Sequence, residues 1–366
     1  MSTSKPALEA VLRQHAEDQY AEELAELARE DKRQRPPNWV LSPWAVRTYL
    51  MGGRLSNGFV VSPKYIGNAR LIEIAVATLA TDRALLLYGL PGTAKSWVSE
   101  HLAAAITGNS TLMIQGTAGT DENAIRYGWN YARLLVEGPS PTALVVSPMM
   151  HAMEIGKFAR LEELTRIPSE VQDTLITILS EKTLPVPELN IEVQARKGFN
   201  VIATANNRDK GVNELSSALK RRFNVVVLPL PSSASEEIAI IVKRVGEMAL
   251  NLDLPAPKNV AEEVARVVSI FRELRSGSTE DGKVALKSPT GGLSTAEAIA
   301  VMVGGISHAT FFNDGLLTPD MLASNMIGAV VKDPVQDKTV LGEYLETVLK
   351  KRRGFEGYYA SLTDQL

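Results

Sequence analysis

The pattern of hydrophobic and polar residues changes twice along the chain. Over residues 1–34, Leu, Val and Tyr recur at roughly helical spacing among Ala, Glu and Arg, which predicts a charged helical arm. Pro36 and Pro37 follow, and proline ends a helix because it lacks the amide donor and restrains the residue before it. From about residue 63 short apolar runs alternate with helical stretches, and beyond Pro231 only helical patterns remain.

Five apolar runs predict the strands of one sheet. They cover residues 84–88, 111–115, 158–161, 201–204 and 224–228. Strands that alternate with helices are typical of a parallel sheet covered on both faces, so we expect an α/β fold. The later helical patterns cover residues 236–250, 261–275, 295–309 and 319–331. The expected organisation is therefore an arm and linker (1–58), an α/β domain (59–231) and a helical domain with a C-terminal tail (232–366).

Composition narrows the function classes. Lys and Arg number 39 against 42 Asp and Glu, a net charge of −3, so the basic excess of a general nucleic-acid binder is missing and a nucleic-acid partner is disfavoured. The chain has no cysteine, its first residues are charged, and no apolar run approaches the roughly 20 residues of a spanning helix. We expect a cytoplasmic protein that does not enter the membrane.

The strongest local signal is the segment GLPGTAKS at residues 89–96, which lies between an apolar run and a helical stretch. In such a loop the glycines let backbone amides wrap phosphates, Lys95 meets the β and γ oxygens, and Ser96 ligates Mg²⁺. The sequence therefore predicts binding of ATP with Mg²⁺. The predicted binding residues are Gly89, Leu90, Pro91, Gly92, Thr93, Ala94, Lys95, Ser96 and Trp97.

One position of this loop departs from the usual pattern. Ala94 stands where a glycine usually precedes the lysine. Alanine is tolerated there only if the position needs no positive φ. The alternative interpretation of the segment is a glycine turn with a surface lysine.

A second motif supplies carboxylates. The run 158–161 ends in Glu162 and Glu163, which predicts that Glu162 holds the metal through its water shell and that Glu163 is the general base. Arg160 is unusual in a strand that should be buried. The alternative is a strand that simply enters a solvated helix.

Residues 156–182 resemble the Walker B strand and the following helix of the AAA+ superfamily, and within it of the MoxR family of the helix-2-insert clade. A predicted hairpin (183–186 with 191–195) resembles the one that this clade inserts before its first sensor. The stretch 199–207 resembles the sensor strand, where Asn206 would orient the attacking water; without that context, Asn206 reads equally as a turn residue.

The resemblance also implies an arginine finger and a pore-facing insert. Arg222 is our choice for the finger, with Arg221 as the alternative; a basic helix end is the simpler interpretation. A hairpin is predicted from residues 132–136 and 142–146. The aromatic residues before it, which either grip a client or pack in the core, are Tyr127, Trp129 and Tyr131.

Taken with the resemblance, these motifs imply an AAA+ ATPase that works as a homo-oligomer, a hexameric ring, with chaperone-like remodelling of a protein client. By resemblance the client would be a protein such as one with a von Willebrand factor A-type domain. The alternatives are a nucleotide-gated scaffold with little turnover and a nucleic-acid motor. The family's lid arginine has no match in residues 291–298, so Lys287 or another residue of the lid would replace it.

Overall fold

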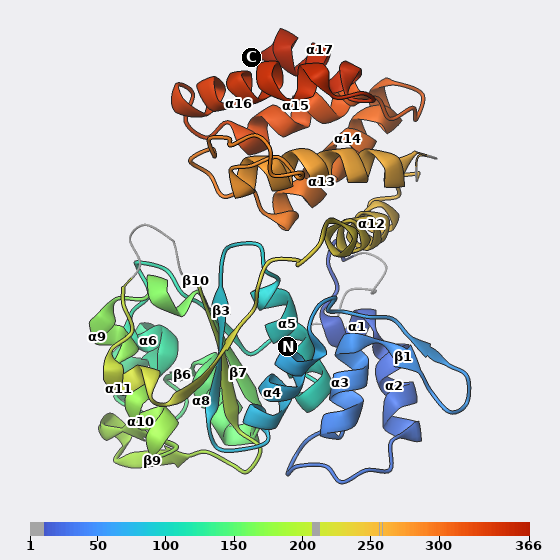
Figure 1. Cartoon of the computed structure of the whole chain (residues 1–366). Coiled ribbons are helices and arrows are strands. Elements are labelled where there is room, and N and C mark those ends of the chain that lie inside the picture. The colour runs from blue at the N-terminus through green and yellow to red at the C-terminus, as the bar shows by residue number, and fades with distance from the viewer. Residues whose placement is uncertain (1–10, 207–212, 256, 258) are drawn as a thin grey trace. The chain divides into compact units, whose positions relative to one another are not determined.

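The computed structural model describes residues 11–206, 213–255, 257 and 259–366. The chain divides into two compact units. The first ends at Pro229 and leaves out the three loop residues Pro91–Thr93, which group with the second unit, Leu230–Leu366. We call them the α/β unit and the helical unit. Each is described by itself below (Figure 1).

A five-stranded parallel sheet forms the centre of the α/β unit, in the order β11-β3-β10-β7-β4. Its strands are β3 (Ala84–Gly89), β4 (Met113–Gln115), β7 (Phe158–Glu162), β10 (Asn200–Asn206) and β11 (Phe223–Val227). Each of the five predicted apolar runs is a strand, which confirms the α/β prediction. The sheet is apolar on both faces because helices cover both, as the continuous apolar runs indicate.

Successive side chains of β3 point to opposite faces of this sheet. Leu85 and Leu87 belong to one buried cluster, together with residues of α4 (Ala69–Leu79) and α5 (Lys95–Thr107). Leu86 belongs to the other, together with residues of α8 (Pro148–Ile155) and α10 (Leu175–Ser180). The strands that carry the predicted motifs are thereby fixed from both sides. The remaining short elements here are α9 (Ser169–Gln172), α11 (Ser217–Lys220), η2 (Leu164–Arg166) and η3 (Pro187–Leu189).

The described part of the predicted arm is two helices rather than one, α1 (Ala16–Gln19) and α2 (Ala21–Glu30). They are followed by α3 (Pro43–Met51) and a small hairpin of β1 (Gly53–Arg54) and β2 (Val60–Val61). Leu27 of α2 is fully buried in the same cluster as Leu85 and Leu87. The arm therefore packs into the α/β unit.

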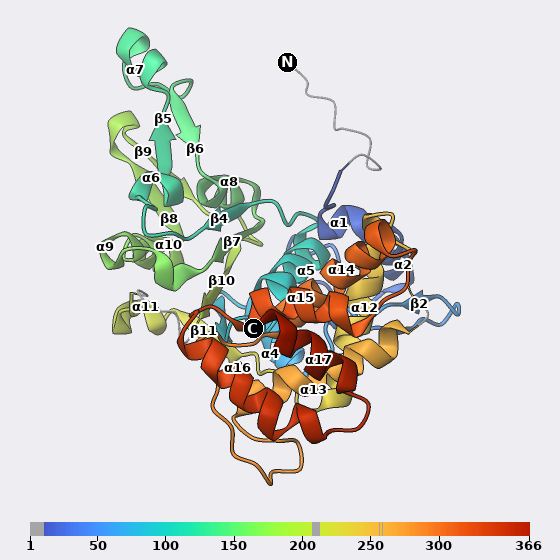
Figure 2. The same cartoon turned by 90° about the horizontal axis from the view of Figure 1, so that it is seen from above.

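The predicted hairpin at 183–195 is confirmed, with β8 (Thr183–Val186) antiparallel to β9 (Ile191–Gln194). The hairpin predicted from 132–136 and 142–146 is wrong in its first strand. There the strand is β5 (Tyr127–Trp129), after α6 (Glu122–Ile125), and it pairs with β6 (Leu144–Val146). Figure 2 shows this hairpin extending away from the central sheet.

Residues 131–137 form a helix, α7 (Tyr131–Glu137), at the end of that hairpin. The Asn130 side chain accepts a hydrogen bond from the Arg133 amide and so caps the first turn, and Gly138 at φ 71° ends the helix. Ala, Arg and Leu are strong helix formers, and this local preference explains why the strand prediction fails.

The helical unit contains α12 (Ala234–Asn251), α13 (Val260–Ser276), α14 (Thr295–Phe312), α15 (Pro319–Val330), α16 (Gln336–Thr347), η4 (Leu349–Lys351) and α17 (Glu356–Gln365). The first four helices match the predicted patterns, whereas α16 and α17 were not predicted. Among the described helices, α14 is long and apolar enough to cross a membrane by length and composition. Met302 and Ile306 of α14 lie in the core of the helical unit, which is typical of a core helix of a globular domain.

Candidate nucleotide site

The predicted phosphate loop connects β3 to α5, so strand, loop and helix follow in the predicted order. The Lys95 side chain is folded back onto the loop, where its Nζ donates to the carbonyl oxygens of Gly89 (3.1 Å) and Leu90 (2.7 Å). Ser96 is exposed in the first turn of α5. The lysine and the helix N-terminus therefore meet at one place, which favours an anion.

Ala94 adopts the left-handed conformation, with φ 62° and ψ 22°. The condition under which alanine seemed tolerable, a position without positive φ, is therefore not met. A β-carbon in this region costs roughly 1–2 kcal/mol, because it approaches the following carbonyl oxygen. The left-handed conformation at Ala94 leads the chain from the loop into α5. The loop adopts it although alanine, rather than glycine, stands at this position. Gly92, at φ 77°, has the residue type that its conformation favours.

The sheet register places the motifs at one edge. Asn206, the last residue of β10, pairs with Gly89, the last residue of β3. On the other side of β10, Ala203 pairs with Leu161, directly before Glu162. The carboxyl ends of the parallel strands thus bring the loop, the two glutamates and Asn206 together. Asn207 lies outside the described residues.

Glu162 is almost completely buried, and its carboxylate accepts three hydrogen bonds. The hydroxyl of Ser99 (2.8 Å) and the guanidinium of Arg160 (2.8 Å) donate to Oε1. The hydroxyl of Thr204 (2.7 Å) donates to Oε2. Buried carboxylates need such donors because they have lost their water.

This arrangement accounts for the unusual arginine in the strand. Arg160 also donates to the Ser99 hydroxyl (3.0 Å) and to the carbonyl oxygens of Ser96 (3.2 Å) and Ser110 (2.9 Å). Arg160 and Glu162 are two residues apart and therefore share one face of β7. That spacing was the signal from which the pair could have been predicted. Nothing in the sequence indicated Ser99 or Thr204, because they come from α5 and β10.

Glu163 follows the strand in a left-handed conformation, with φ 54°. Its amide donates to the Thr204 hydroxyl (3.0 Å), and its carboxylate accepts from Arg166 (3.2 Å) at a partly exposed position. Gly116 lies against the same backbone, since a β-carbon there would lie 2.5 Å from the Glu163 carbonyl oxygen. Backbone strain of this kind persists where the surroundings hold a side chain in place.

The arginines proposed for the finger lie at the other edge of the sheet. Phe223, directly after Arg222, pairs with Ala84 at the start of β3. The Arg222 guanidinium donates to the Ser180 hydroxyl and to the Ala218 carbonyl oxygen (2.6 Å) of its own chain. Arg221 is exposed. Both arginines therefore lie at the opposite edge of the sheet from the phosphate loop.

The three aromatic residues of the insert differ in exposure. Tyr127 is buried and donates to the Glu188 carboxylate (2.8 Å); burial and this hydrogen bond raise the pKa of its hydroxyl. Trp129 is partly buried. Tyr131 is 70% exposed in α7. Tyr127 thus has a packing role, and Tyr131 is free of the core.

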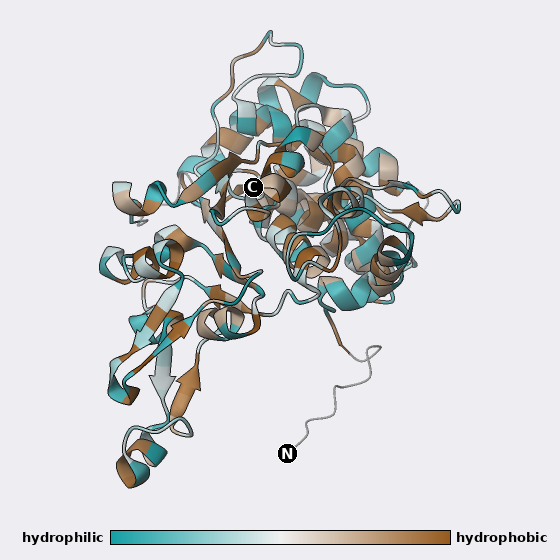
Figure 3. Cartoon of the chain, turned by 90° about the horizontal axis from the view of Figure 1, so that it is seen from below, coloured by the Kyte–Doolittle hydropathy of each residue, from teal (hydrophilic) through white to brown (hydrophobic). Residues whose placement is uncertain are grey.

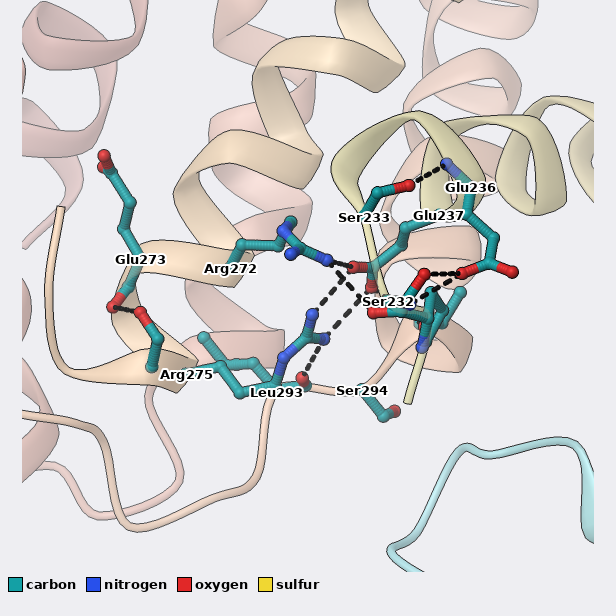
Figure 4. Close-up of polar contacts among 12 residues, drawn as sticks. Ser232, Ser233, Glu236, Glu237, Arg272, Glu273, Arg275, Leu293 and Ser294 are labelled. Carbon is teal, nitrogen blue, oxygen red and sulfur yellow. Dashed lines mark hydrogen bonds and ion pairs between the residues drawn. The ribbon is translucent and has the colours of Figure 1, made fainter. Parts of the chain in front are cut away.

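In the helical unit, Ser294 caps α14 in a capping box with Glu297, at the place where the family's arginine would stand. Lys287 is exposed and donates to Glu343 (2.8 Å). Arg272 and Arg275 of α13 both donate to the Glu237 carboxylate of α12, and Figure 4 shows both directed at it. Burial raises the pKa of Glu237, but the hydrogen bonds and charge of Arg275 outweigh it, and the pKa lies below its ordinary value.

Two family models match parts of this chain. The family model "AAA domain (dynein-related subfamily)" matches residues 84–223, and "YehL-like AAA+ ATPase C-terminal domain" matches residues 235–361. Midasin of Dictyostelium discoideum is 23% identical over 175 residues, which are 46% of this chain and 3% of midasin. Among solved structures, NtrX of Brucella abortus with ADP has a TM-score of 0.48 at 13% identity and covers 82% of this chain and 65% of that chain. A RuvB variant of Thermotoga maritima has a TM-score of 0.43 at 16% identity, with 77% of this chain and 76% of that chain covered.

YehL of Escherichia coli (strain K12) is similar to this chain over both units. That protein is 40% identical over 348 residues, which are 93% of this chain and 94% of YehL. The second family model lies wholly within the helical unit, and the match to YehL extends over both units. The chain belongs to the YehL-like family of AAA+ ATPases.

Proposed function

We propose that the protein hydrolyses ATP at the carboxyl edge of its central sheet. The observation that carries this proposal is the register, which brings Gly89, Asn206 and the end of β7 to one edge. Lys95 would leave the loop carbonyls for the β and γ oxygens. Glu163 would accept a proton from the attacking water, which Asn206 would orient.

Oxygen ligands for Mg²⁺ are present beside the loop. Mg²⁺ prefers carboxylate and hydroxyl oxygens and keeps several waters. The exposed Ser96 hydroxyl and Glu162 fit this preference, since Oε2 of Glu162 accepts a single side-chain hydrogen bond among the described residues. When bound, the ion would neutralise the charge that develops on the phosphates.

The active unit in this proposal is a homo-oligomeric ring, a hexamer as in the AAA+ class. A single chain carries its Lys95 loop and Arg222 at opposite ends of β3. Arg222 would therefore act on the nucleotide of the neighbouring subunit. Its contacts with Ser180 and the Ala218 carbonyl hold it at the surface of its own unit.

The end of the β5–β6 hairpin supports a protein client. Tyr131, Leu135 and Val136 of α7 are 70%, 88% and 85% exposed, and Figure 3 shows apolar residues at this end. Large exposed apolar side chains on a projecting element are typical of a protein contact. The MoxR-like insert makes this tip the proposed client site, with a von Willebrand factor A-type domain protein as the client to test.

A nucleotide-gated scaffold with little turnover is the second candidate. It is favoured by the ion pair of Arg160 with Glu162, which occupies a carboxylate that hydrolysis would use. Phosphate release by the purified protein separates the two candidates. We expect ATP-dependent release in the parent and none in Lys95→Ala. A parent protein that binds ATP without release would favour the scaffold.

A further inference from the structure

We propose that Arg160 is a positioning residue that offsets the charge of Glu162 at the metal end of the nucleotide site, so that nucleotide binding depends only weakly on Mg²⁺. The inference rests on the proposed ATP site. In this proposal the Arg160 guanidinium neutralises negative charge that Mg²⁺ would otherwise neutralise.

The guanidinium contacts one proposed metal ligand directly and the backbone of the other. It donates to Oε1 of Glu162 (2.8 Å) and to the backbone oxygen of Ser96 (3.2 Å). Arg160 and Glu162 are both more than nine-tenths buried, so their attraction is screened by little water. A fixed positive charge at this position repels a divalent cation that approaches Glu162.

Most acceptor positions of the Glu162 carboxylate are already filled, and the position that remains is on Oε2. A carboxylate offers about four acceptor positions, and Ser99, Arg160 and Thr204 fill three of them. The Ser110 carbonyl oxygen (2.9 Å) holds the far side of the guanidinium, so that it cannot turn away easily. Arg160 thus fixes the direction of the carboxylate as well as its charge.

Stability alone does not test this role, because replacing a buried ion pair is often neutral. The readout is the affinity for N-methylanthraniloyl-ADP, measured by fluorescence against Mg²⁺ concentration. In the parent, EDTA should change the affinity by less than about threefold. Arg160→Gln removes the charge and keeps an amide donor. The Mg²⁺ concentration that gives half of the change in nucleotide affinity should therefore fall about tenfold or more. Arg160→Lys keeps the charge, so this concentration should stay within about threefold of the parent value.

A double-mutant cycle shows whether Arg160 acts through Glu162. In the Glu162→Gln background, Arg160→Gln should no longer shift the half-maximal Mg²⁺ concentration. An unchanged concentration in the single variant, or an equal shift in the Glu162→Gln background, overturns the proposal. If Arg160→Gln does not fold, the parent carries the test, and a tenfold loss of its affinity in EDTA overturns the proposal. Absence of nucleotide binding in the parent at every Mg²⁺ concentration would instead refute the ATP site.

Discussion

Arg222 lies at the amino-terminal edge of the central sheet, whereas Lys95 lies at its carboxyl edge. Phe223 pairs with Ala84, and the loop that carries Lys95 begins after Gly89, so the length of β3 separates the two. Five residue steps of about 3.3 Å make this separation roughly 17 Å along the strand, far beyond the reach of one arginine side chain. Both side chains can therefore contact one phosphate only if they come from different subunits.

The left-handed Ala94 predicts that a substitution with glycine stabilises the protein. Ala94→Gly removes a strain of roughly 1–2 kcal/mol and adds about 0.4–1 kcal/mol of chain entropy to the unfolded state, so we expect a net gain near 0.5–1 kcal/mol. Urea unfolding measures the change. Ala132→Gly in the exposed helix α7 is the matched control and should destabilise by about 0.5–1 kcal/mol. Equal signs for the two variants would contradict the assigned strain.

The buried Glu237 predicts a pH-dependent contribution to the stability of the helical unit. Its carboxylate is held by Arg272 and Arg275, so Glu237→Gln should destabilise this unit by about 1–3 kcal/mol at neutral pH. Because the folded pKa lies below the ordinary value, this contribution is present above the unfolded pKa of about 4.3 and is lost as the pH falls through the folded pKa. Urea unfolding at pH 7 and near pH 3 measures it.

The difference in the free energy of unfolding between the parent and Glu237→Gln should therefore be smaller near pH 3 than at pH 7. Glu262→Gln, at an exposed position of α13, should show little difference at either pH. A Glu237→Gln difference that stays constant down to the acid pH would show that the charge of Glu237 contributes nothing.

From the exposed apolar residues of α7 we expect a protein contact that depends on bound nucleotide. A photo-crosslinking amino acid in place of Leu135 should give discrete protein adducts in a Glu163→Gln background with ATP, because that variant holds ATP without fast turnover. The same amino acid in place of the exposed Glu170 in α9 is the control. Identical adducts from both positions, or adducts that persist in a Lys95→Ala background, would contradict a client site at the tip.

The parallel sheet and the first four helices of the helical unit followed from periodicity, because buried strands and amphipathic helices impose it on neighbouring residues. The resemblance placed Asn206 at the end of a strand, and the structure adds that it pairs with Gly89. What could not be predicted depends on contacts between distant segments. Arg160 is unusual in a buried strand, and the sequence does not show its hydrogen-bond partners. Ser99, Ser110 and Glu162 come from three separate segments of the chain.

Two local predictions failed for local reasons. Residues 132–136 were interpreted as a strand from their apolar content, but a capped helix with a glycine at its end satisfies the same residues better. Alanine at position 94 was expected to be tolerated only without a positive φ, and the loop imposes a positive φ regardless. A steric preference of one residue is small beside the interactions that fix a whole loop.

The most direct test of a shared active site mixes Arg222→Ala protein with Glu163→Gln protein and measures ATP hydrolysis. Each variant alone should be nearly inactive, since the general base supplies about 10²-fold or more and an arginine finger 10³ to 10⁵ in rate. In mixed rings some interfaces combine an intact Glu163 with an intact Arg222 of the neighbour, and these should regain activity well above either variant. Sizing of mixed tagged proteins confirms that subunits exchange, and a parallel mixture with Arg221→Ala identifies which arginine reaches across. Mixed rings that stay inactive with both arginine variants, together with full activity of an isolated monomer, would contradict the ring.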